Sequence, residues 1–401
     1  MEKKHKKALL LFSVLFCVGL VLIPKRIYGA VLYLAPDSQT ICQGDSFLVE
    51  LRVDSEGEEI NTIKADLMFP SNLLGAIDFS KGGSILTLWV EEPVIKNGEI
   101  SFLAGRPGGF KGDGLIGKIT FQGKETGEAE INFKENSQVL LHDGKGTPAK
   151  VSFSEGNYEI VKKPEGLPVV ISQSHPDPNN WYRETTLSLY WELKEEAEYS
   201  WILSYDAEAE PNEIPDRPEP KEGLVWMGAM GYENLKDGIY YFHLKEKLLG
   251  QDWSEKVTLR AMIDSTPPVS FQPEIGQSST VFMGKYFLSF VTVDEMSGID
   301  HYEVSEIKIQ SLIEQLFKKE EEGEWKIAET LYLLEDQDLR SKIFVKAIDK
   351  VGNAKVAQII PAYQINWKDV IAFIILLLIG KAIWVIMKKI RTRQIQNRNE
   401  H

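Results

Sequence analysis

The feature that most limits the fold of this 401-residue sequence is a two-residue alternation of apolar and polar side chains in short segments. The segment DSFLVELRV starts at residue 45. As a strand, it would have these apolar side chains on one face: Phe47, Val49, Leu51 and Val53. TIKADLMF does the same with Ile63, Ala65, Leu67 and Phe69. EISFLAG, GKITFQG, AEINFK and SQVLLHDG continue the pattern and are bounded by Gly, Asp-Gly or Asn. Side chains of a strand alternate between its two faces, so short strands with regular turn signals predict antiparallel β-sandwiches.

Turn-rich and proline-rich segments divide the chain into several domains. The first sandwich is predicted at 31–161, and KKPEGLPVV then begins a second module at 162–265. DSTPP (264–268) marks the boundary to a third module at 266–362. Both later modules again show short strand segments, such as GIYYFHLKEK and SKIFVKAID. Within the third, SEIKIQSLIEQLFKKEEEG has apolar residues at helical spacing and predicts a short helix. The fold class is therefore all-β, with tandem sandwiches.

Both ends of the sequence predict membrane targeting. Residues 1–30 combine basic residues with an apolar run and small residues, the pattern of a signal peptide. An uncleaved anchor is the alternative there. The apolar stretch at 367–388 has the length of a transmembrane helix, and the basic tail at 389–401 predicts a cytoplasmic C-terminus. This places residues from about 31 to 366 outside the cell membrane.

Charge content limits the classes of partner, and cysteine content limits how the domains can be stabilised. The chain has 59 acidic and 45 basic residues, a formal net charge of −14. An acidic exterior argues against binding of nucleic acid and for a solvated surface protein. Only Cys42 lies beyond the predicted signal peptide, so packed cores rather than internal disulfides must stabilise the domains.

A literal G-x-G-x-x-G occurs at 112–117, in the sequence GDGLIG. A dinucleotide-binding fingerprint needs a helix after these glycines, because the helix N-terminus receives the phosphate. Here LIGKITFQG alternates and predicts a second strand. The glycines are therefore expected to supply positive φ angles in a loop or bulge between antiparallel strands, and no nucleotide or other cofactor is expected.

The sequence shows no strong catalytic or metal-ligand pattern. His142, His175, His243 and His301 are scattered singly, without zinc-ligand spacing. No acid–base pair or catalytic triad stands out, so we expect a protein that is not an enzyme and has no metal ligands of its own. Four residues at predicted strand ends favour turn capping, with a structural cation as the alternative: Asp294, Asp300, Asp349 and Asn353.

Residues 31–161 resemble a cohesin domain. The resemblance rests on three stretches in order: GDSFLVELRVDSEGEEINTIKADLMFPSNLL, NGEISFLAGRPGGFKGDGLIGKITFQGKETGEAEINF and VLLHDGKGT. It implies a nine-stranded jelly-roll sandwich that binds a dockerin-type protein module, with Ca²⁺ supplied only through that partner. The implied partner-binding residues are Thr62, Lys64, Asp66, Arg106 and Lys111.

The two later modules are similar to fibronectin-III-like and bacterial Ig-like modules. DGIYYFHLKEK…DWSEKVTLRAMIDSTPP and SGIDHYEV…IFVKAIDKVGN carry this similarity. It implies spacers that hold the first domain away from the membrane. The sequence thus predicts a non-catalytic surface scaffold that binds a dockerin-type module. Two alternatives stay open, a polysaccharide-binding surface protein and a structural or adhesive envelope protein without a dedicated ligand.

Overall fold

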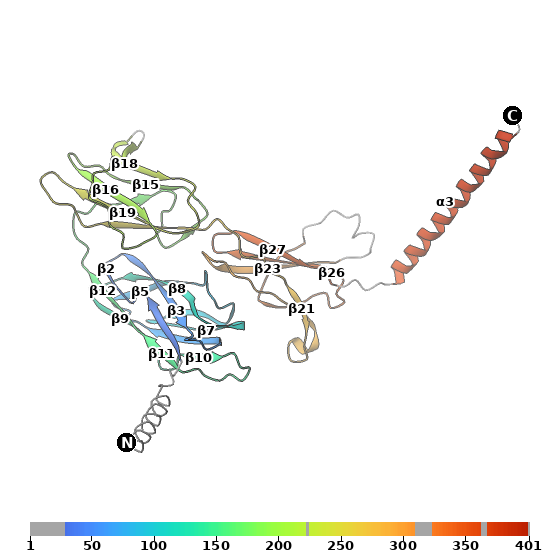
Figure 1. Ribbon diagram of the computed structural model, residues 1–401, viewed down its shortest axis with the longest axis horizontal. Helices are drawn as coiled ribbons and strands as arrows, with labels where there is room; N and C mark the ends of the chain where they lie inside the picture. Colours follow the sequence, from blue (N-terminus) through green and yellow to red (C-terminus); the bar gives the residue numbers. More distant parts are fainter. Residues whose placement is uncertain (1–28, 222–223, 309–322, 362–366, 400–401) are drawn as a thin grey trace, which may run out of the picture. The chain divides into compact units, whose positions relative to one another are not determined.

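The structure is a computed structural model that describes residues 29–221, 224–308, 323–361 and 367–399 (Figure 1). These residues form two compact units. One holds the described residues up to Phe79 together with Leu88–Lys162, and the other holds Ser80–Thr87 and the described residues from Lys163 onward. The signal peptide predicted at 1–30 lies almost wholly outside the described residues. The helix predicted around Ile309–Leu316 lies outside them too.

Twelve labelled strands build the first unit. They are β1 (Ala30–Ala35), β2 (Ser38–Cys42), β3 (Ser46–Asp54), β4 (Ile60–Met68), β5 (Leu74–Ser80), β6 (Leu88–Lys96), β7 (Glu99–Phe110), β8 (Asp113–Gly123), β9 (Gly127–Phe133), β10 (Gln138–Leu141), β11 (Val151–Ser154) and β12 (Gly156–Val161). One sheet has the order β11-β1-β3-β8-β5. The other runs β2-β12-β9-β4-β7-β6, with β10 also paired to β4. The predicted all-β sandwich architecture is confirmed.

The core of this unit consists of the inward faces of the strands. Every second residue of β3 is buried, from Phe47 to Val53, as the alternation predicted. In β4 the buried residues are Ile60, Ile63, Ala65 and Leu67. Aromatic rings fill the centre, and the Phe47 ring lies 5.8 Å from that of Phe121 and 5.1 Å from that of Tyr158, centroid to centroid. Burial of each such side chain stabilises the fold by about 1.5–3 kcal/mol.

The G-x-G-x-x-G segment begins in the connection between β7 and β8 and continues into β8. Gly112 has a φ of +115° in the connection to β8, whereas Gly114 and Gly117 lie inside β8. The register of β8 against β3 shifts opposite Leu51 and Arg52, which marks a bulge in the pairing. The prediction of a loop or bulge is therefore confirmed, although only the first of the three glycines needs a positive φ.

We predict that Gly112→Ala lowers the free energy of unfolding of the first unit by about 1–2 kcal/mol, because a side chain at this φ is strained. A Cβ added there meets no atom within 4 Å, so steric contacts add nothing to the strain. Gly231→Ala is the matched control, because its added Cβ also meets no atom within 4 Å but its φ is not positive. Urea unfolding of both variants measures the effect. A Gly112→Ala chain as stable as the wild type would contradict this account.

The second sandwich has two four-stranded sheets, β13-β15-β18-β17 and β14-β20-β19-β16. Its strands are β13 (Ile171–Ser172), β14 (Trp181–Tyr182), β15 (Leu187–Glu192), β16 (Glu198–Ser204), β17 (Glu219–Lys221), β18 (Leu224–Tyr232), β19 (Gly238–Lys247) and β20 (Val257–Ile263). Trp191 and Phe242 lie at the centre of its core, with ring centroids 5.9 Å apart. Several aromatic side chains of this module therefore serve its core.

The third sandwich packs a three-stranded sheet, β21-β22-β25, against a four-stranded one, β24-β23-β26-β27. Its elements are β21 (Glu274–Gln277), the 3₁₀ turn η1 (Phe282–Gly284), β22 (Tyr286–Ser289), β23 (Ile299–Lys308), β24 (Lys326–Ala328), β25 (Leu331–Leu333), β26 (Ser341–Asp349) and β27 (Ala354–Ile359). Leu288, Val304 and Val345 are buried between the sheets.

A single long helix, α3 (Trp367–Asn399), lies at the C-terminal end of the described chain (Figure 1). A helix at 367–388 was predicted, and it is present. Within the described residues, however, no helix combines enough length and apolar character for a bilayer crossing. The predicted transmembrane span is thus not supported.

Two buried histidines make the second sandwich sensitive to acid. His175 and His243 are almost fully buried, and burial lowers the pKa of both imidazoles. His243 lies 2.8 Å from the Thr258 hydroxyl and 3.1 Å from the Asp206 carbonyl oxygen, a pair of contacts that suits the neutral ring.

We predict that the second sandwich loses stability as pH falls below about 6.5, where the unfolded histidines take up protons that the folded ones resist. Urea unfolding followed by tryptophan fluorescence at about pH 7.5 and about pH 5.5 measures this loss. His243→Gln removes one titrating group. The free energies of unfolding at the two pH values should therefore differ less in this variant than in the wild type. If the free energies of unfolding at the two pH values differ as much in His243→Gln as in the wild type, His243 does not contribute to the acid sensitivity.

Candidate functional site

Strand β4 presents the predicted partner-binding residues on one side of its sheet. Thr62, Lys64 and Asp66 are half-buried and alternate with fully buried core residues. Asp66 accepts a hydrogen bond of 2.7 Å from the Asn136 side chain, and its carboxylate lies 3.9 Å from the Lys64 ammonium. These contacts hold two of the three side chains in place on the outward surface.

The strands beside β4 extend this surface. Thr62 pairs with Gly105 of β7, Lys64 with Leu103 and Asp66 with Ser101. The next strand, β6, pairs with the same β7 positions through Leu88, Glu91 and Val94. Directly paired residues share one face of a sheet. We call this surface the β4–β7–β6 face, defined by Thr62, Lys64, Asp66, Leu88, Glu91, Val94, Ser101, Leu103 and Gly105.

Exposed aliphatic side chains distinguish β6, the edge strand of the sheet. Leu88, Val90 and Val94 are 39%, 65% and 54% exposed. Exposed apolar side chains on an unpaired edge mark a surface that other proteins can cover. The sequence pattern did not indicate these three residues, because LWVEEPVIK lacks the strict alternation seen in β3 and β4.

Arg106 and Lys111 lie at and beyond the end of this face. Arg106 follows Gly105 on β7, and its guanidinium carbon lies 5.8 Å from the centre of the Phe110 ring. Lys111 is exposed in the connection from β7 to β8, a strand of the opposite sheet. The structure therefore brings Thr62, Lys64 and Asp66 together and places Lys111 apart from them.

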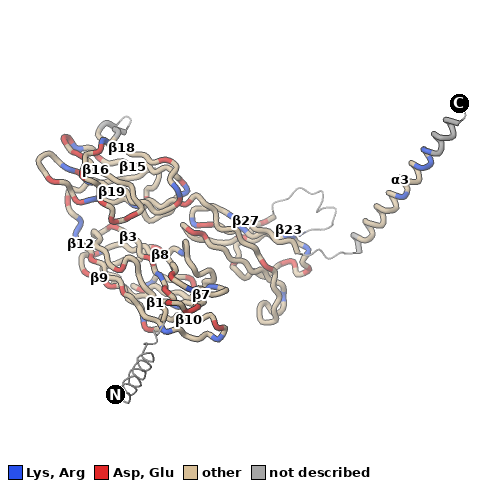
Figure 2. Tube along the Cα trace, in the orientation of Figure 1, with Lys and Arg blue, Asp and Glu red and all other residues tan. Residues whose placement is uncertain are grey.

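The other half of the same sheet is acidic on its outward side. Glu128 of β9 is paired directly with Glu159 of β12, and Glu130 is paired with Asn157. The Glu130 carboxyl, by a hydrogen bond, raises the pKa of the neighbouring Glu155. Figure 2 shows acidic residues along these two strands. Directly opposed like charges are unfavourable, so this half of the sheet should attract positive charge.

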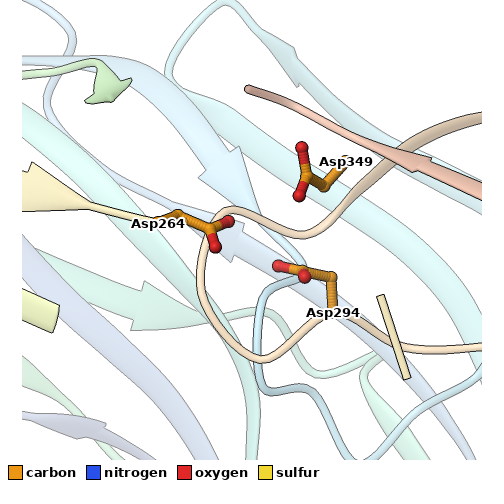
Figure 3. A group of neighbouring side chains, drawn as sticks. All are labelled: Asp264, Asp294 and Asp349. Atoms are coloured by element: carbon orange, nitrogen blue, oxygen red, sulfur yellow. The ribbon is translucent and has the colours of Figure 1, made fainter. Parts of the chain in front are cut away.

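A second candidate site lies in the other unit and consists of three buried aspartates. Asp264 directly follows β20, Asp294 lies between β22 and β23, and Asp349 is the last residue of β26. Their exposed fractions are 0%, 4% and 1%. One carboxylate oxygen from each lies within 4.8 Å of the other two, and Figure 3 shows the three groups around a common space. It is the one cluster of three or more His, Cys, Asp or Glu ligands in the described part of the chain.

Tight turns fix the orientation of two of these carboxylates. One oxygen of Asp294 accepts hydrogen bonds from the backbone N–H groups of Met296 and Gly298, at 3.1 and 2.9 Å. One oxygen of Asp349 accepts from Val351 and Asn353 N–H, at 3.0 and 2.8 Å. The predicted turn capping is therefore confirmed for Asp294 and Asp349. Asp300, in contrast, is exposed and contacts His301 at 2.6 Å.

Burial makes the ionised forms of this cluster costly. Burial, together with the nearby carboxylates of Asp264 and Asp349, raises the pKa of Asp294 to about 6. Burial also raises the pKa of Asp264, against the opposing effect of hydrogen bonds from the Ser297 hydroxyl and N–H at 2.5 and 3.1 Å. The sequence pattern did not mark Asp264 as a candidate ligand, because it belongs to the DSTPP boundary segment.

Comparison with known proteins gives matches among solved structures only. No family model and no curated protein matches the chain. A non-cellulosomal cohesin from the archaeon Archaeoglobus fulgidus is 18% identical over 33% of this chain and 92% of that chain, with a TM-score of 0.29. The third ScaB cohesin of R. flavefaciens, solved in complex with a group 1 dockerin, is 14% identical over 35% and 100%, with a TM-score of 0.27. A type II cohesin domain from the cellulosome of Acetivibrio cellulolyticus is 10% identical over 32% and 95%, with a TM-score of 0.28.

Proposed function

We propose that residues 31–161 form a non-catalytic, cohesin-type binding module whose β4–β7–β6 face binds a protein module of the dockerin type. The observation that carries the proposal is this face itself. It combines a polar central strand, with Thr62, Lys64 and Asp66 outward, and an edge strand with exposed Leu88, Val90 and Val94. An apolar area beside fixed polar groups is the composition of many protein interfaces.

The exposed apolar side chains favour a protein over a polysaccharide as the ligand. Sugar rings stack on aromatic side chains, whose faces are flat and amphipathic. Across the described residues of the first unit, the large apolar side chains with high exposure are all non-aromatic: Met68, Ile77, Leu88, Val90 and Val94. The most exposed apolar surface of this module therefore fits a protein better than a polysaccharide.

The charge of the sheet specifies the partner further. Glu128, Glu130 and Glu159 are exposed beside the β4–β7–β6 face. A partner with basic residues at the matching edge would be steered toward this surface, and salt would screen the attraction. Association should therefore slow as the salt concentration rises.

In this proposal the two later sandwiches are spacers. Each has its own hydrophobic core, around Trp191 in one and Val345 in the other. A module with its own core keeps its shape without support from the binding module. The location of residues 31–366 outside the cell remains a prediction from the sequence.

We predict that the full chain binds a member of a panel of Ca²⁺-loaded dockerin modules in a saturable 1:1 complex, measured by calorimetry. Thr62→Arg puts a large charged side chain in the middle of the face and should weaken binding about tenfold or more. Leu48→Arg is the matched control, because Leu48 is a half-buried outward residue of β3, the central strand of the opposite sheet. It should leave binding unchanged.

Three other outcomes would contradict the proposal. If Thr62→Arg and Leu48→Arg lose the same amount of dockerin affinity, the loss reflects general destabilisation of the module and not a binding face. Retention of the chain on insoluble polysaccharide, without binding to any dockerin, would support the carbohydrate alternative. Binding to neither target would favour a structural or adhesive protein without a dedicated ligand.

A further inference from the structure

We propose that Asp264, Asp294 and Asp349 bind a calcium ion that ties the segment after β20 to the third sandwich. This site is independent of the dockerin-binding function proposed for the first module. Its three carboxylates face a common space, and all of them are buried (Figure 3). The partners of these carboxylates are backbone N–H groups and the Ser297 hydroxyl, none of which carries a net charge.

Unpartnered oxygens give a second, independent indication of a ligand. One oxygen of Asp349 is fixed by its turn, but the other is buried and accepts no hydrogen bond from the described residues. The side-chain oxygen of Asn353, which is 3% exposed, is equally unpartnered. A buried carboxylate oxygen without a partner is unfavourable, and a cation at the shared space would provide the missing partner.

The geometry and the ligand type fit Ca²⁺. Oxygens bound to Ca²⁺ lie about 2.3–2.6 Å from the ion, so two of them are separated by at most about 4.6–5.2 Å. The three carboxylates meet this condition, with their oxygens within 4.8 Å of one another. A set made only of oxygen ligands favours a hard cation over zinc or copper. Ca²⁺ also accepts irregular coordination, completed by carbonyl oxygens or water.

A surface pocket lies beside the cluster. It is lined by both Asp264 and Asp294, and also by the Thr266–Ser270 segment, Met296 and Lys355. Two of the three aspartates therefore border this pocket, although their side chains are buried.

The proposed ion joins two parts of the second unit. Asp264 begins the boundary segment DSTPP, whereas Asp294 and Asp349 belong to turns of the third sandwich. The Asn353 amide already links these parts, because it donates to the carbonyl oxygens of Asp264 and Thr266 at 3.1 and 3.3 Å. Calcium binding would add a charged cross-link at the same place and stiffen the segment.

The test uses the full chain, stripped with EDTA and titrated with CaCl₂ in the absence of any dockerin. We expect a saturable heat of binding by calorimetry and a rise in the melting temperature of the third sandwich with added Ca²⁺. Asp349→Asn should weaken Ca²⁺ binding about tenfold or more and abolish the thermal shift. Without Ca²⁺, the same variant should melt no lower than the wild type, because it removes one buried negative charge.

Asp336→Asn is the matched control. Asp336 is also a buried, turn-capping aspartate of the third sandwich, and it accepts hydrogen bonds from Arg340 N–H and the Ser341 hydroxyl at 2.8 and 2.6 Å. It lies outside the cluster, so its variant should melt lower with and without Ca²⁺ and keep the full Ca²⁺-induced shift.

Two results would overturn the proposal: no Ca²⁺-dependent heat or thermal shift in the wild type, or a shift that persists in Asp349→Asn. If Asp349→Asn does not fold, Asp294→Asn provides the same comparison. A wild-type chain that responds equally to Mg²⁺ at the same concentration would also contradict the assignment to calcium.

Discussion

The alternation of side chains along each strand is the constraint on which the rest of this structure depends. A residue that enters the core forces its neighbours outward, so the buried Ile63, Ala65 and Leu67 determine where Thr62, Lys64 and Asp66 lie. A shift of one residue in the pairing of β4 would exchange the two sets. The candidate binding face is therefore fixed by the packing of the core behind it, and it needs no loop to position its polar groups.

Electrostatics sets the character of both candidate sites. On the first unit, exposed Glu128 and Glu159 are directly opposed across two strands, and water screens most of their repulsion. In the second unit, Asp264, Asp294 and Asp349 are buried, where repulsion between ionised groups is far larger. We therefore propose a basic protein partner for the exposed glutamates and a small cation for the buried aspartates.

The sequence predicted the parts of the fold that follow from local pattern. The alternation identified β3 and β4 and their buried residues. The sequence did not predict β6, because the pairing of β6 with β7 shifts register between Trp89 and Glu91 and again before Val94, and these shifts interrupt the alternation. The sequence placed Asp294, Asp349 and Asn353 at strand ends, but Asp264 is a distant part of the chain that only tertiary packing brings beside them. The structure has a helix at the predicted membrane span, but no helix of the described residues is long and apolar enough to cross a bilayer.

The central claim is that the β4–β7–β6 face is the binding surface of the first module. Amide hydrogen exchange of the full chain, with and without a saturating Ca²⁺-loaded dockerin module, tests it most directly. The account predicts slower exchange in β4, β7 and β6 in the complex, and no change in β1 and β3 of the opposite sheet. Protection confined to the opposite sheet or to the two later sandwiches would contradict it.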